Sequence, residues 1–97
     1  MQNTVIQMKN LRKYPRKSCS ENTFFATQTM VFEGLMKNIS AQGVFIESLL
    51  ALPVGQIITV AIPSNHHHKG KDSKIEGMVV WTNEDGFGVE FNEIIKV

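Results

Sequence analysis

The chain has 97 residues, which is enough for one domain with a modest core but not for a deep catalytic cleft. Hydrophobic residues make up 42% and charged residues 20%, which excludes a disordered chain, and no apolar stretch approaches the roughly 20 residues of a membrane-spanning helix. The net charge of +1 is unevenly distributed: residues 1–20 hold five basic and no acidic side chains, and the other 77 hold five basic and nine acidic ones. We therefore expect an anionic partner to bind near the N-terminus.

Cys19 is the single cysteine, so no internal disulfide can form and a thiolate-rich metal site is excluded. The first eight residues lack the apolar run of a secretory signal, and we expect a cytoplasmic protein without membrane insertion. The basic neighbours of Cys19 favour a lowered thiol pKa. However, no histidine precedes position 66 to act as a base, so the thiol is interpreted as structural or incidental.

The first half of the chain contains three short β-prone runs, which are Thr23–Thr27, Val31–Ile39 and Val44–Glu47. The second run alternates Leu35, Lys37 and Ile39 on one face, and its Gly34 predicts a bulge or a close approach of another segment. No apolar pattern of helical period is sustained over ten residues between positions 17 and 91.

The second half contains three clearer strands, which are Gln56–Ile62, Lys74–Thr82 and Gly86–Phe91. Trp81 has the same parity as Ile75 and Val79, so we predict that it belongs first to the core. The six phenylalanines alternate with polar positions and are likewise predicted to be core residues: Phe24, Phe25, Phe32, Phe45, Phe87 and Phe91.

Turn-forming sequences separate the runs, at 41–43, 52–55 and 83–86. The segment Ser64–Ser73 is predicted to be a polar loop, and its His66–His68 tract to be a loop tip rather than a metal site, because adjacent histidines point in alternating directions. Six short strands predict an all-β fold, a small antiparallel barrel or sandwich with an N-terminal segment before the first strand. Residues 93–97 are too few for a C-terminal helix of more than about one turn.

Two clusters of polar residues are the candidate ligand-binding residues of the chain. In the first, Arg12 and Arg16 lie four residues apart in a segment that Pro15 keeps out of a helix, and each guanidinium can bind a phosphate or the O6/N7 edge of guanine with two hydrogen bonds. In the second, Asn38 and Ser40 lie two residues apart and share one face of a strand end. Gly43 is predicted to give the following turn its conformational freedom and to let a ligand approach the backbone.

The pattern Arg12-x-x-x-Arg16 followed by Asn38-x-Ser40-x-x-Gly43 resembles the paired signature of PilZ domains, bacterial receptors for cyclic di-GMP. The strand and turn pattern from about Leu11 to Phe91 is similar as well. The resemblance implies a six-stranded antiparallel barrel with a flexible basic arm that folds over the ligand. It also implies that Arg12, Arg16, Asn38, Ser40 and Gly43 contact cyclic di-GMP. Lys13 and Trp81 are candidates for further contacts.

On this interpretation residues 1–10 are an extension, residues 11–92 form the barrel domain with its basic arm at 11–17, and residues 93–97 are a short tail. The expected function is that of a non-catalytic receptor, without metal or cofactor, which relays the cyclic di-GMP signal by altering a contact with a protein effector in motility or biofilm regulation. Two alternatives stay open: a nucleotide-silent adaptor of the same fold, and a small nucleic-acid-binding barrel. The second is disfavoured because no stripe of exposed aromatic residues is predicted.

Overall fold

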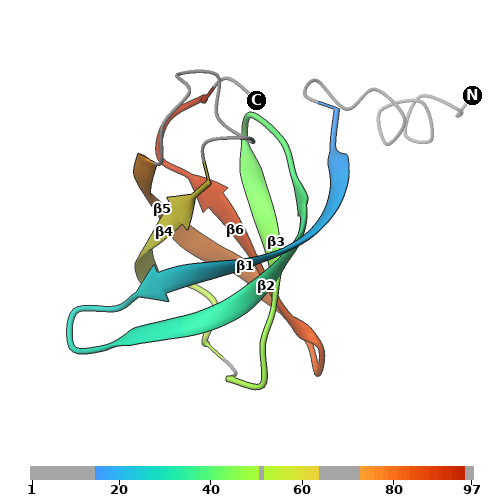
Figure 1. Cartoon of the computed structure of the whole chain (residues 1–97). Helices are drawn as coiled ribbons and strands as arrows, with labels where there is room; N and C mark the ends of the chain where they lie inside the picture. The colour runs from blue at the N-terminus through green and yellow to red at the C-terminus, as the bar shows by residue number, and fades with distance from the viewer. Residues whose placement is uncertain (1–14, 51, 64–72, 96–97) are drawn as a thin grey trace, which may run out of the picture.

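The computed structural model describes residues 15–50, 52–63 and 73–95, which form six strands and no helix. The strands are β1 (Lys17–Ala26), β2 (Val31–Ile39), β3 (Gly43–Glu47), β4 (Ile57–Ile62), β5 (Ser73–Thr82) and β6 (Gly86–Phe91). All pairings are antiparallel, and the order β1-β2-β3-β6-β5-β4 closes into a barrel (Figure 1). The predicted six-stranded antiparallel barrel is thus confirmed. Within these residues, no helix is long and apolar enough to cross a membrane.

The barrel interior is filled by apolar side chains that alternate along the strands. Phe25 is 1% exposed, and its ring centroid lies 5.6 Å from that of Phe32 and 5.1 Å from that of Phe87. Gly34 confirms the predicted close approach, because a Cβ atom there would lie 2.7 Å from Cγ2 of Ile46 on β3. The buried apolar residues are Phe25, Met36, Ile39, Val44, Ile46, Leu52, Ile58, Val60, Ile62, Ile75, Val79, Phe87, Val89, Phe91 and Ile95.

Strand β1 is longer than predicted, because it begins at Lys17 rather than Thr23. The added residues, KSCSEN, are polar and have little intrinsic preference for strands. They are extended because they pair with the end of β2, where Lys17 faces Ile39 and Ser18 faces Asn38. Tertiary pairing therefore overrides local propensity at the point where the basic arm joins the barrel.

Irregular pairing changes which side chains face the core. The register of β2 against β3 shifts between Met36 and Asn38, so Met36 and Ile39 are both fully buried while Leu35 is only half-buried. The predicted alternation of Leu35, Lys37 and Ile39 on one face is therefore wrong, because a bulge changes the parity of the strand. Two phenylalanines also depart from the predicted core: Phe24 is 54% exposed, and Phe45 is half-buried.

The segment after β6 packs against the turn between β2 and β3. The backbone N–H of Ile95 donates to the carbonyl oxygen of Ala41 at 2.9 Å, and that of Phe91 donates to the carbonyl of Gln42 at 2.8 Å. The Ile95 side chain is buried in the core. Residues 93–95 are not helical, and these contacts hold in place the turn that carries the second polar cluster.

Candidate functional site

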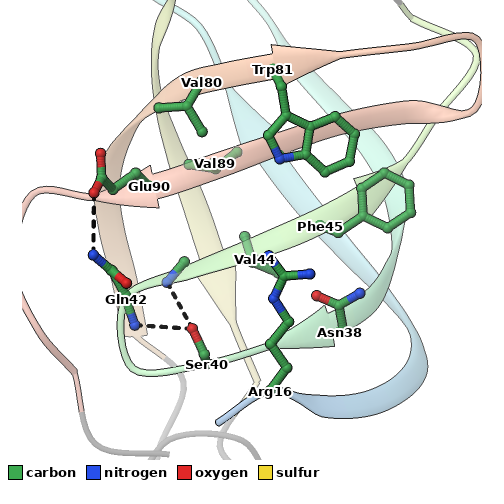
Figure 2. A pocket seen from close by; sticks show the side chains of 12 residues that line it. Arg16, Asn38, Ser40, Gln42, Val44, Phe45, Val80, Trp81, Val89 and Glu90 are labelled. Atoms are coloured by element: carbon green, nitrogen blue, oxygen red, sulfur yellow. Dashed lines mark hydrogen bonds between the residues drawn. The ribbon is translucent and has the colours of Figure 1, made fainter. Parts of the chain in front are cut away.

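A surface pocket of about 300 Å³ lies on the outer face of the barrel where β2, β3, β5 and β6 meet (Figure 2). Four of the residues that we predicted to bind a ligand line it, namely Arg16, Asn38, Ser40 and Gly43. Trp81 lines it as well. Arg12 and Lys13 lie outside the described residues, as do His66, His67 and His68. In the described ranges, no three His, Cys, Asp or Glu side chains are grouped so as to hold a metal ion.

Strand pairing explains how Arg16 reaches the second cluster. Because Lys17 faces Ile39 and Ser18 faces Asn38, the residue just before β1 lies beside the end of β2. Figure 2 shows the Arg16 side chain directed toward the side of the pocket where Asn38 lies. Arg16 is exposed to solvent, so its guanidinium is free to face an incoming anion.

Ser40 builds the turn as well as lining the pocket. Its backbone N–H donates to the carbonyl of Gly43 at 2.9 Å, and its Oγ accepts from the N–H groups of Gln42 and Gly43 at 3.2 and 3.3 Å. The side chain is nearly buried, at 7% exposure. Its lone pairs are therefore used by the turn, and the hydroxyl proton is the group that it can offer to a ligand.

Gly43 is required for a reason that differs from the predicted one. In the described residues, positive φ occurs at Gly55 alone, so Gly43 does not supply special turn dihedrals. Instead, a Cβ atom at position 43 would lie 2.2 Å from the carbonyl oxygen of Val89 on β6. Only glycine allows the start of β3 to pair this closely with β6.

The prediction that Trp81 belongs first to the core is wrong, because its side chain is 38% exposed. The register of β5 against β6 shifts between Val79 and Trp81, and this bulge turns Trp81 outward although Val79 is fully buried. The indole lies over Gly88, where a Cβ atom would be 2.2 Å from Nε1. It stacks on Phe45 with centroids 5.2 Å apart and an interplanar angle of 20°, so the two rings form an aromatic wall of the pocket.

Gln42 and Glu90 also line the pocket, although neither was predicted from the sequence. They are connected by a hydrogen bond of 3.3 Å from Gln42 Nε2 to Glu90 Oε2. The alternation in β6 does place Glu90 on the outer face, but only the pairing of Gly43 with Glu90 brings it to the pocket.

Cys19 is not an activated nucleophile. Burial, followed by the nearby charge of Glu21, raises its pKa, and the weaker opposing effect of Lys37 does not reverse the shift. This corrects the expectation that basic neighbours lower the pKa. The thiol packs at the edge of the core with Sγ 3.5 Å from the carbonyl oxygen of Met36, which agrees with a structural role.

Comparison with family models gives a match to the PilZ domain over residues 10–96. The chain belongs to the PilZ domain family. PilZ domains bind cyclic di-GMP and are generally non-catalytic. A search of curated proteins gave no significant match.

Two solved structures share the fold of this PilZ domain. The inhibitor of motility MotI/DgrA from Bacillus subtilis aligns with a TM-score of 0.72 and 20% identity, covering 86% of this chain and 43% of that one. The PilZ domain of CeSA from a cellulose-synthesizing bacterium aligns with a TM-score of 0.64 and 8% identity, covering 80% of each chain. The chain thus spans less than half the length of MotI/DgrA, and at these identities the likeness concerns the fold.

Proposed function

We propose that this PilZ domain is a non-catalytic cytoplasmic receptor that binds cyclic di-GMP in the outer pocket and relays the signal by altering a contact with a protein effector. The observation that carries the proposal is that Arg16, just before β1, meets Asn38, Ser40 and Gly43, from the turn between β2 and β3 and its flanks, in one pocket. The family match supports the same ligand.

The pocket has the chemistry that a cyclic dinucleotide requires. Arg16 offers a planar guanidinium for a phosphate or for the O6/N7 edge of guanine, and Asn38 offers both a donor and an acceptor for a base edge. The Trp81 and Phe45 rings offer an apolar wall against which a purine can pack. Arg12 and Lys13 are proposed to complete the site from the arm.

Binding would act as a switch through the arm. Fixing the arm residues 11–14, which lie outside the described residues, against a ligand would cost roughly 1–2 kcal/mol per residue in backbone entropy. Charge-assisted hydrogen bonds, at roughly 1.5–3 kcal/mol each, and base stacking offset this cost only when the ligand is present. The ordered arm then presents a new surface to an effector. MotI/DgrA is an inhibitor of motility, which supports motility control as one such output.

Calorimetric titration of the folded protein with cyclic di-GMP tests the proposal. We expect saturable binding in the micromolar range or tighter, and no comparable binding of single-stranded oligonucleotides. An absence of heat at high micromolar ligand would reject the receptor and favour the nucleotide-silent adaptor. Stronger, steeply salt-dependent binding of oligonucleotides would favour the nucleic-acid-binding barrel.

Trp81 is the single tryptophan, so its fluorescence reports on the pocket directly. We expect cyclic di-GMP to quench this fluorescence in a saturable manner. Loss of base–aromatic stacking costs roughly 1–3 kcal/mol, so Trp81→Ala should weaken binding by about 5- to 150-fold. Phe24→Ala removes an exposed ring on β1 that does not line the pocket, and it should leave the affinity unchanged. Equal losses in the two variants would contradict a role for Trp81.

A further inference from the structure

Glu90 is the one carboxylate among the described residues that line the pocket. Its neighbours Val89 and Phe91 turn into the core and are 3% and 6% exposed, so Glu90 points to the outer face of β6. Its cross-strand partner on β3 is Gly43, which carries no side chain. A negative charge therefore lies within a pocket that we have assigned to a ligand with two phosphates.

The orientation of this carboxylate is set by Gln42. The amide Nε2 of Gln42 donates to Oε2 of Glu90 at 3.3 Å, and Oε1 has no hydrogen-bond partner among residues 15–50, 52–63 and 73–95. Figure 2 shows Glu90 and Gln42 on the opposite side of the pocket from the Trp81 and Phe45 rings. Glu90 thus retains acceptor capacity at one end of the pocket, away from the aromatic wall.

A carboxylate repels phosphate, so the partner of Glu90 must be a part of the ligand that carries hydrogen-bond donors. Guanine presents two adjacent donors, N1–H and the N2 amino group, which a carboxylate can accept together. Adenine presents the acceptor N1 at the same place, and its lone pair would face the carboxylate. Asn38 is neutral, so in the described part of the pocket only Glu90 can make this bond with charge assistance.

We propose that Glu90 binds the Watson–Crick edge of one guanine and makes the pocket select guanine over adenine. The inference rests on the proposed function, because it assigns a role within the same ligand site. A site built to accept hydrogen bonds discriminates strongly against a ligand that lacks the matching donors. Phosphate contacts from Arg16 do not provide this discrimination, since cyclic di-GMP and cyclic di-AMP carry the same phosphates.

The test compares the affinities of the parent and of Glu90→Gln for cyclic di-GMP, cyclic di-IMP and cyclic di-AMP by calorimetry. The measured quantity is the ratio of affinities within each protein, because repulsion of the shared phosphates cancels in it. We expect the parent to prefer them in that order, since hypoxanthine keeps N1–H but lacks the amino group. In Glu90→Gln the preference for cyclic di-GMP over cyclic di-AMP should fall at least tenfold. Glu84→Gln, in the turn between β5 and β6, removes the same charge outside the pocket and should keep the parental ratio.

Three outcomes would overturn the role of Glu90. The ratio could be unchanged in Glu90→Gln, or the variant could bind all three nucleotides more tightly by one common factor, which would mean that the carboxylate only repels phosphate. Alternatively, Glu84→Gln could lose selectivity to the same degree. If the parent itself binds none of the three nucleotides, the proposed function falls and this inference falls with it. If the parent binds cyclic di-GMP and Glu90→Gln keeps the parental affinity ratio, only the role of Glu90 is rejected and the proposed function stands.

Discussion

Gly43→Ala is expected to destabilise the barrel severely. The added Cβ would lie 2.2 Å from the carbonyl oxygen of Val89, a backbone atom that cannot move without separating β3 from β6. We expect a loss of roughly 3 kcal/mol or more, at the upper end of the cost of overpacking. Each kcal/mol lowers the Tm of a domain this size by roughly 4–8 °C, so the fall should be on the order of 12 °C or more. Thermal unfolding followed by circular dichroism measures it.

Gly55→Ala is the matched control, because Gly43 is required to avoid a steric clash whereas Gly55 is required for its backbone conformation. Gly55 has a φ of 98°, and a Cβ atom added there would have no atom within 4 Å apart from those of its chain neighbours, so alanine meets backbone strain but no clash. The cost should be about 1–2 kcal/mol, with a smaller fall in Tm. If Gly43→Ala melts with the parent and loses only nucleotide binding, the glycine serves ligand approach rather than strand pairing.

Arg16→Ala is expected to weaken cyclic di-GMP binding by at least about 100-fold without changing stability. The exposed guanidinium of Arg16 can form two charge-assisted hydrogen bonds at roughly 1.5–3 kcal/mol each, and 1.4 kcal/mol corresponds to a tenfold change in affinity. Arg16→Lys keeps the charge but loses the paired geometry, so its affinity should fall between those of the parent and the alanine variant. Calorimetric titration at fixed ionic strength gives the three dissociation constants.

The control for Arg16 is Lys74→Ala, which removes one positive charge from an exposed position of β5 outside the pocket. A specific contact predicts that Lys74→Ala binds as the parent does. If the two alanine variants lose affinity equally, and both losses disappear at high salt, then Arg16 contributes only to the general positive field.

The sequence predicts best the residues whose positions depend on strands that are neighbours along the chain. Asn38 lies near the end of β2 and Ser40 just after it, and the pairing of β1 with β2 brings Arg16 beside them. The alternation of residues in β6 was likewise sufficient to place Phe87 and Phe91 in the core. Local pattern thus predicts the strands and the two polar clusters, and the resemblance to PilZ domains predicts that the clusters share one pocket.

The aromatic and acidic sides of the pocket could not be predicted in this way. The bulge in β5 was not predicted by any sequence pattern. It turns the Trp81 side chain to the outer face, because an extra residue in a strand changes which residues face the core. Phe45 could have been placed outward from its buried neighbours Val44 and Ile46, but its hydrophobic character suggested the core. Glu90 approaches Gly43 only through the pairing of β3 with β6, which are separated by two other strands along the chain.

The same pairing of β3 with β6, together with that of β1 with β4, has a consequence for how the pocket forms. Gly43 must pair with Glu90, and Phe25 must pair with Val60, before the sheet can close into a barrel. Barrels dominated by such distant pairings fold in roughly milliseconds to seconds, much more slowly than helical domains of equal size. The pocket is complete only when these distant pairings have formed, because they bring together Arg16, Asn38, Trp81 and Glu90. The pocket therefore forms late in folding. No short peptide excised from the chain would contain all of it.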